Sequence, residues 1–308
     1  MKLISPSHEI WEQDTSGKPL HSSATSVETM RESLLHGIYA QIERAGRVCY
    51  KSEDKITNDS AKAFVNRLIE SKHYAMLEHG TVYLTIPCAD YNSSEDFMLS
   101  YGTNPYTQWD ASECNWDTKE GYIYVTTNFR VIVENNWMED LECISSPGPK
   151  HPRRITVKFI TSRNIAMELL RHRHFSFAME STRYCNYSRE RFGGELQFIL
   201  PCWLKENPNE PKLIEDPMYD RAIQRMKDAL QMSEFAYMKL LKYGWKPQQA
   251  AVVLPNALKA EIVVTGFMDD WKYLFNLRVK GTTGAPHPQM LEVMKPVYDE
   301  FVKRYGIV

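Results

Sequence analysis

The sequence predicts an α+β fold, because helical and strand-like patterns of apolar residues are mixed along the chain without a strict strand–helix–strand rhythm. Helical stripes and shorter strand-like runs both occur along the 308 residues. That length suits one large domain or two ordinary ones, with a sizeable core. The sequence contains no internal repeat or low-complexity tract, so solenoids and linker-joined arrays are not expected.

The N-terminal third predicts two helices and a strand after an irregular arm. Residues 5–26 are polar and contain Pro, Ser and Thr, which is typical of an arm without regular structure. Apolar residues at helical spacing predict amphipathic helices over 29–47 and 60–72. Residues 81–86 alternate and are β-branched, and Pro87 follows them, so we expect a strand there.

The next segment has the composition of an insertion. Residues 88–122 are rich in Asn, Asp, Ser and aromatic residues, which predicts a long lid-like loop rather than a core element. A strand over 122–127 and a short helix over 128–137 follow, and we take 88–150 as the insertion. A new strand is expected at 154–160.

The C-terminal half predicts mainly helices. Ser162 is a good N-cap for a helix that ends near Arg173. The other expected elements are helices over 217–243, from 247 to 254, over 269–277 and from 288 onward, and a strand over 260–265.

Charge and composition exclude several classes of protein. The net charge is −2 and the pI about 6.5, whereas nucleic-acid or anionic-membrane binders are usually strongly basic. The chain has neither the roughly 18–20 apolar residues of a membrane span nor an N-terminal apolar segment typical of a signal peptide. Six scattered cysteines without a C-x-x-C motif predict reduced thiols. These features favour a cytoplasmic enzyme.

The densest polar cluster is RHRHFSFAMESTRY, residues 171–184. A solvated face could have this composition. However, arginine rather than lysine suits planar, bidentate recognition of phosphates and pyrimidine edges. The spacing of Ser181 and Arg183 would also point a hydroxyl and a guanidinium the same way on an extended segment, as a phosphate clamp requires.

The cluster resembles the signature of the flavin-dependent thymidylate synthases, R-H-R followed by seven residues and Ser. Here these residues are Arg171, His172, Arg173 and Ser181. Three further segments resemble the family in the same order: 45–50, 72–79, and the pair 253–255 with 276–278. The similarity covers roughly residues 30–87 and 151–300.

The resemblance implies a single domain over 1–308 in which helices flank an antiparallel or mixed central sheet. It also implies a homotetramer whose active sites contain residues from more than one chain. The implied reaction is reductive methylation of dUMP to dTMP. 5,10-Methylenetetrahydrofolate would donate the carbon, NADPH would be the reductant and FAD the cofactor. Neither a nucleic-acid nor a membrane partner is implied.

The resemblance also assigns roles to residues. Arg278 would stabilise the anionic uracil ring, and Arg171 would contact the nucleotide or the flavin. Ser181, Thr182 and Arg183 would hold the phosphate, and the positions of Glu168 and Glu180 belong to the same substrate site. The residues assigned to FAD are His73, Glu78, Arg171, His172, Arg173 and Met179. The alternatives are purely structural roles: Arg278 as a charge at a helix C-terminus, and His73 as a histidine of the core.

Several positions depart from the family pattern. Ala178 and Met179 replace the usual Asn-Glu, and a carboxylate appears one residue later at Glu180. Glu168 stands where Gln is usual, and Ala251 where Arg is expected. Either Glu180 takes over the carboxylate's role through a local backbone change, or the contact is lost.

Two rival functions remain open on the sequence. One is a flavin enzyme of the same fold that acts on another pyrimidine nucleotide. The other is a non-catalytic nucleotide- or RNA-binding relative. We expect no metal, because the spacing of the histidines fits no common zinc pattern.

Overall fold

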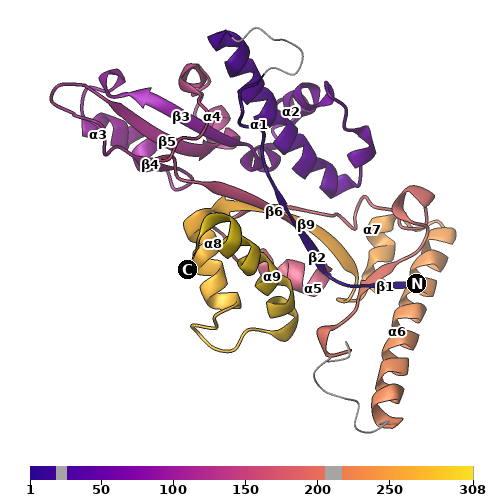
Figure 1. Cartoon of the computed structure of the whole chain (residues 1–308). Coiled ribbons are helices and arrows are strands. Elements are labelled where there is room, and N and C mark those ends of the chain that lie inside the picture. The colour runs from indigo at the N-terminus through magenta and orange to yellow at the C-terminus, as the bar shows by residue number, and fades with distance from the viewer. Residues whose placement is uncertain (19–25, 205–216, 308) are drawn as a thin grey trace.

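The computed structural model in Figure 1 describes residues 1–18, 26–204 and 217–307. Within these ranges the fold is mixed α/β, as predicted, and its sheets are mainly antiparallel. The four-stranded sheet has the order β2 (Ser7–Trp11), β6 (Arg154–Ser162), β9 (Lys259–Phe267) and β7 (Ser176–Met179). The other sheets are β3 (Thr81–Pro87), β5 (Tyr122–Asn128) and β4 (Gln108–Asp110), and the parallel pair β1 (Lys2–Ile4) and β8 (Gln197–Ile199).

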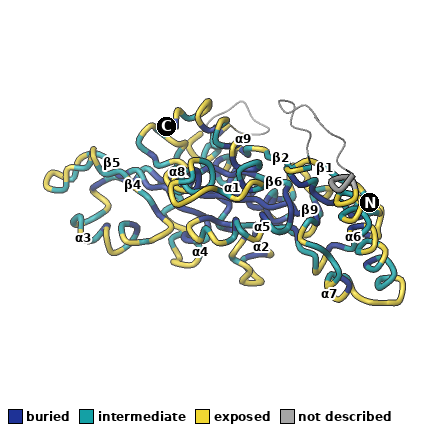
Figure 2. The backbone as a smooth tube through the Cα atoms, turned by 90° about the horizontal axis from the view of Figure 1, so that it is seen from below, coloured by how far each residue is buried: buried dark blue, intermediate teal, exposed yellow. Residues whose placement is uncertain are grey.

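Strand β9 is the centre of the molecule. All nine of its residues are buried, and it pairs along its full length with β6, from Ser162↔Lys259 to Arg154↔Phe267. Figure 2 shows these two strands as dark, buried tube through the middle of the chain. The predicted strands at 154–160 and 260–265 are therefore confirmed, each slightly longer than expected.

Helices cover both faces of the four-stranded sheet, because each face presents apolar side chains. On one face, α5 (Arg163–Leu169), α8 (Met268–Arg278) and α9 (Pro288–Tyr305) pack a core with Phe159 and Ile262 of the strands. On the other face, α1 (Val27–Tyr50) contacts β7 and β9. The core on that side includes Ala178 and Val263, and continues into α2 (Ser60–Glu70), β3 and β5.

A third core lies at the end of the sheet, where α6 (Pro217–Lys242) and α7 (Pro247–Ala250) pack beside β1 and β8 (Figure 1). The expected helices at 29–47, 60–72, 217–243 and 269–277 are all confirmed. A short helix, α4 (Phe129–Glu134), follows β5 as expected. Among the described helices, none has the length and apolar character needed to cross a bilayer.

The expected irregular arm at 5–26 is wrong for its first part. Strand β2 forms there and pairs antiparallel with β6, and Trp11 at its end is buried. Strand β2 has only five residues, and its first more buried residue is the polar His8, so its sequence shows too little apolar alternation to predict a strand. Residues 19–25 of the expected arm lie outside the described residues.

The expectation that 88–122 is a lid-like loop outside the core is also wrong in part, because two of its aromatic residues belong to the core. Phe97 and Tyr101, from α3 (Ser94–Phe97) and the π-helical turn η4 (Met98–Gly102), are fully buried. The Phe97 ring meets the Trp109 ring edge-on, and the Tyr101 hydroxyl donates to Asp140 at 2.6 Å. Phe97 and Tyr101 thus pack in the core that includes residues of β5.

The expectation that all six thiols are reduced is corrected as well. Cys88, directly after β3, forms a disulfide with Cys114, because the turn before β5 returns to the end of β3. The other four cysteines form no disulfide in the described part of the chain.

Candidate functional site

The predicted motif at 171–184 runs through three different local structures. Its first residues form the turn after α5, whose N-cap Ser162 accepts a hydrogen bond from the Ile165 N–H, as predicted. Residues 176–179 form β7, an edge strand that the sequence did not reveal. Residues 181–184 form a second turn. The two polar parts of the motif therefore lie at opposite ends of β7.

At the first end, the structure brings together two predicted residues that are far apart in sequence. Arg278, the last residue of α8, donates from Nε to Nε2 of His172 at 3.2 Å. Burial and the neighbouring guanidinium lower the pKa of His172 to about 4, so the ring is neutral at pH 7 and can accept this bond. Arg171 and Arg173 are exposed beside them, and Glu168 is half-buried in the preceding helix.

At the second end, Ser181 anchors a tight turn. Its N–H donates to the Cys49 carbonyl at 3.0 Å, and its carbonyl accepts from the N–H of Cys185. Its hydroxyl accepts from the Arg183 N–H at 3.3 Å. The expected extended segment is therefore wrong, because the chain turns as soon as it leaves β7.

One side chain of this turn contacts an adjacent helix. Arg183 is exposed and donates from Nε to Gln248 Oε1 of α7 at 3.1 Å. Its guanidinium lies 5.3 Å from the centre of the Tyr184 ring. Thr182, between Ser181 and Arg183 in the sequence, is half-buried. The turn thus presents a fixed guanidinium and two hydroxyl groups near the start of α7.

The departures at 178–180 are explained by the alternation of β7. Ala178 packs with the α1 side of the sheet, whereas Met179 packs with the α8 and α9 side. The ladder continues without a bulge to the Glu180 N–H, which donates to the Glu261 carbonyl at 2.8 Å. Glu180 therefore points away from the face of Met179. We find no local backbone change that would bring its carboxylate to Met179's face.

Two of the residues expected near the flavin lie after α2: His73 directly precedes η2 (Tyr74–His79), and Glu78 lies within it. His73 is exposed, and Glu78 pairs with Arg130 of α4 at 2.6 Å. His79 is fully buried, with Nδ1 2.8 Å from Thr265 Oγ1. Burial and the charge of Arg154 lower its pKa to about 3.

Arg154, at the start of β6, was missed by the sequence analysis. Its buried guanidinium donates to the Glu78 carbonyl at 3.1 Å, while its Nε has no hydrogen-bond partner within the described residues. Desolvation lowers its pKa to about 10, so it remains charged at pH 7. A single arginine at the start of an apolar strand gives no sequence signal of its own.

Arg154 lines a cavity of about 300 Å³ together with residues from the first motif turn. Arg173 and His174 come from this turn, Gln108 from β4, and Asp270 from α8. Arg154 and Arg173 are both hydrogen-bond donors, and the buried Nε–H of Arg154 has no partner among the described residues. Such a pair of guanidinium groups suits an anionic group such as a phosphate. The structure therefore places Arg173 next to the η2 region, although the motif turn itself is exposed.

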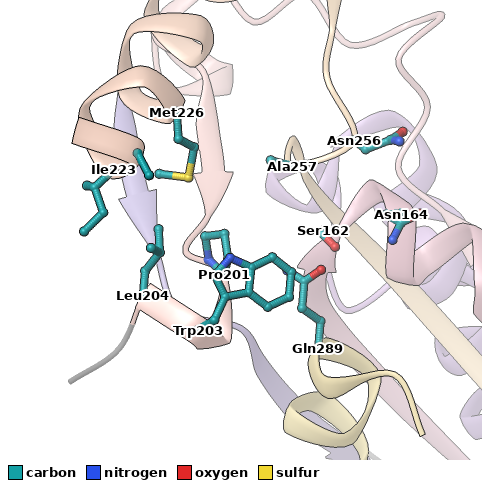
Figure 3. Close-up of a pocket in the computed structure, with 11 residues that line it drawn as sticks. Ser162, Asn164, Pro201, Trp203, Leu204, Ile223, Met226, Asn256, Ala257 and Gln289 are labelled. Carbon is teal, nitrogen blue, oxygen red and sulfur yellow. The ribbon is translucent and has the colours of Figure 1, made fainter. Parts of the chain in front are cut away.

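A larger cavity, of about 460 Å³, lies between the start of α5, the 3-10 turn Cys202–Leu204 and α6 (Figure 3). Trp203, Ile223 and Met226 form its apolar wall, and the amides of Asn164, Asn256 and Gln289 face it. No predicted site residue appears among its described lining residues, and none of these carries a charge. A phosphate group would find no counter-charge there.

Within the described part of the chain, no group of three or more His, Cys, Asp or Glu side chains is placed to hold a metal ion.

Comparison with known proteins matches residues 150–305 to the family described as thymidylate synthase complementing protein. The chain belongs to this family. The match begins just before β6 and includes the motif turns, β7, β9 and Arg278.

Several relatives carry the name flavin-dependent thymidylate synthase. The protein of Corynebacterium efficiens is 32% identical over 123 residues, which cover 38% of this chain and 46% of that protein. The protein of Haloarcula marismortui is 30% identical over 116 residues, which cover 34% and 45%. The chain thus spans about half the length of the curated relatives it matches. Among solved structures, a UMP/dUMP methylase PolB from Streptomyces cacaoi aligns over 98% of this chain and 93% of its own, with 16% identity and a TM-score of 0.43.

Proposed function

We propose that this thymidylate synthase complementing family member is an FAD-dependent thymidylate synthase. It would methylate dUMP to dTMP with 5,10-methylenetetrahydrofolate as carbon donor and NADPH as reductant. The observation that carries the proposal is the contact of Arg278 with a neutral His172, which fixes a permanent positive charge beside the arginine-rich motif.

Arg278 and Arg171 are the proposed residues for the uracil ring. C5 of uracil is a poor nucleophile, so negative charge must be stabilised in the ring as C5 attacks. Arg278 Nε is held by His172, which leaves its two terminal nitrogens to donate to the ring. A neutral imidazole suits this task, because an imidazolium would repel the guanidinium.

The turn at 181–183 is the proposed phosphate site. Ser181, Thr182 and Arg183 supply hydroxyl and guanidinium donors, and Gln248 orients Arg183. Glu168 lies near the ring end of the motif rather than at this turn, so its charge need not face the phosphate. Glu180 belongs to this substrate site because its buried hydrogen bonds fix the backbone directly before Ser181.

FAD would supply the hydride chemistry. The residues proposed to hold it are Arg171, His172 and Arg173 of the motif, with His73, Glu78 and Met179. We add Arg154, because its unpaired Nε–H and the adjacent Arg173 face one cavity and suit an anionic part of the cofactor.

We also propose the homotetramer with intersubunit sites. The two polar parts of the motif lie at opposite ends of β7, so a complete site needs residues from a second copy. Exposed apolar side chains on and after α6 support such an interface: Met232, Phe235, Tyr243 and Val252.

The test is incubation of the purified protein with FAD, NADPH, methylenetetrahydrofolate and dUMP, and detection of dTMP by mass. Arg278→Ala should lower dTMP formation at least about 100-fold while FAD stays bound, because a transition-state donor is lost. Arg304→Ala, a surface arginine of α9, is the matched control and should keep full activity. Near-normal turnover of Arg278→Ala would overturn the role of this residue.

The same incubation separates the rival functions. If no dTMP forms but other pyrimidine nucleotides stimulate NADPH oxidation, the substrate is a different nucleotide, consistent with Glu168, Met179 and Ala251 at the positions that depart from the family pattern. If the protein binds no FAD at all, the catalytic proposal is wrong.

A further inference from the structure

The cavity of about 460 Å³ in Figure 3 has no part in the proposed function. It lies between the start of α5, the turn Cys202–Leu204, α6 and the start of α9. Cavities that hold small molecules have volumes of about 300–1,000 Å³, apolar walls and a few well-placed polar groups. This cavity meets all three conditions, and its lining indicates which ligand it would take.

The walls of the cavity are apolar and partly aromatic. Figure 3 shows Leu204, Ile223 and Met226 on one side and the Trp203 ring at the lower end. Trp203 is 55% exposed, and its ring lies edge-on to that of His287, with 6.5 Å between the ring centres. A flat indole face and a polarisable Met sulfur both favour contact with a planar ring.

The other side of the cavity carries uncharged polar groups. Asn164 and Asn256 supply two side-chain amides, and Gln289, in the first turn of α9, supplies a third. The Asn164 N–H donates to the Asn256 carbonyl at 3.2 Å, so the backbone holds these two residues together. Within the described residues, no hydrogen bond occupies the three side-chain amides. Each amide therefore has both a donor and an acceptor to offer.

This lining excludes two classes of ligand. No described lining residue carries a charge, so an ion would lose its hydration without gaining a counter-charge. A wholly apolar ligand would cover the amides of Asn164 and Gln289, which are already half-buried, and leave them without partners. An uncharged ring with a polar edge satisfies both the walls and the amides.

We propose that this cavity binds the adenine ring of an adenine nucleoside. The ring would lie against Trp203, and its polar edge would meet the amides of Asn164 and Gln289. Asn and Gln side chains pair with N6 and N7 of adenine, because one amide supplies both the acceptor and the donor that this edge requires. The two fused rings of a purine also present more area to the indole than the single ring of a pyrimidine.

The inference does not rest on the proposed thymidylate synthase activity. Among the described lining residues, none is assigned to dUMP or to FAD. The same adenine chemistry occurs in a free nucleoside and at the adenine end of a dinucleotide, and the test separates these two sources.

The test is calorimetric titration of the purified full chain with adenosine and, separately, with uridine. We expect adenosine to bind at least about fivefold more tightly than uridine. Trp203→Ala should weaken adenosine binding at least about fivefold, because stacking on the indole is lost. Gln289→Met keeps the length of the side chain and removes its amide, and should weaken binding about threefold or more. Gln224→Met, on the exposed side of α6, is the matched control and should bind as the wild type does.

Three outcomes would overturn the proposal: no binding of adenosine, uridine binding as tight as that of adenosine, or adenosine binding unchanged in Trp203→Ala or in Gln289→Met. If Trp203→Ala does not fold, Gln289→Met alone decides, because it changes neither the size of the side chain nor its helix.

The titration is repeated with FAD and with NADPH present. Suppression of adenosine binding by one of them would assign the cavity to the adenine end of that dinucleotide, and undisturbed binding would assign it to a separate adenine nucleoside. Formation of dTMP is not measured here, so a failure of the proposed function leaves this result unchanged.

Discussion

Glu180 shows how strongly a single buried carboxylate can matter to this fold. Its two oxygens accept bonds from a hydroxyl, an ammonium and a backbone N–H. The residue immediately after it begins the Ser181 turn. Glu180 therefore contributes both to the stability of the fold and to the position of that turn.

Glu180→Gln should lower the free energy of unfolding by about 3 kcal/mol, because it leaves Lys259 and its neighbours with one carboxylate fewer in a buried cluster. Urea denaturation at pH 7 measures the change. Glu134→Gln removes the same charge from a half-exposed pair with Arg130 and should change stability by less than about 1 kcal/mol. Equal effects of the two substitutions would show that burial does not strengthen the role of Glu180.

For single residues, the sequence indicated which side chains belong to the candidate site better than it indicated which of them are in contact. The arginine-rich motif and Arg278 were found through family resemblance, but their contact joins residues 106 positions apart. No local pattern reports such a pairing. Arg154 was missed for the same reason, since its importance comes from the cavity that other elements form around it.

Among the elements, α1 depends on a close approach to the N-terminal segment. A Cβ at Gly37 would lie 2.0 Å from the Asp14 carbonyl oxygen. The segment after β2 therefore packs directly on the helix backbone.

Gly37→Ala should destabilise the protein, although alanine favours a helix over glycine by about 1 kcal/mol. The clash is with backbone, which cannot move aside cheaply, so we expect a net loss of about 1–3 kcal/mol. Thermal unfolding measures it. Glu32→Ala, at an exposed position of the same helix, should be close to neutral. A stabilised Gly37→Ala would mean that the segment after β2 is not packed on α1.

The helices and the longer strands were predictable because each repeats its pattern over several residues. Strands β1, β7 and β8 have three or four residues each, too few to display an alternation. The composition of the 88–122 segment suggested a loop, yet Phe97 and Tyr101 are buried in the core, and the strand within the segment pairs with β5, most of which lies beyond it.

The whole molecule should lose stability in mild acid through its buried histidines. The pKa of His79 falls to about 3 and that of His172 to about 4, from an ordinary value of 6.5. Below pH 6.5 the unfolded chain binds protons that these residues cannot bind in the fold. Stability therefore decreases as the pH falls from 7 to 5, by about 2 kcal/mol through the fully buried His79 and by less through the half-buried His172, whose charge is partly screened by solvent.

Urea unfolding of His79→Gln at both pH values tests this. Its loss between pH 7 and pH 5 should be about 2 kcal/mol smaller than that of the wild type, whatever its absolute stability. His287→Gln, at an exposed position, should leave the difference unchanged. The idea fails if His79→Gln shows the same pH dependence as the wild type.

The pairing of β6 with β9 has a consequence for synthesis of the chain. Each β6 residue meets a partner about 100 residues farther along, which a ribosome adding about 5–20 residues per second makes about 5–20 s later. During that interval β6 can pair with β2, which is already made, but the N–H and C=O groups of its other edge have no partner strand. The strand is also rich in Ile, Val and Phe. The nascent chain is therefore most exposed to aggregation while residues 163–258 are being translated.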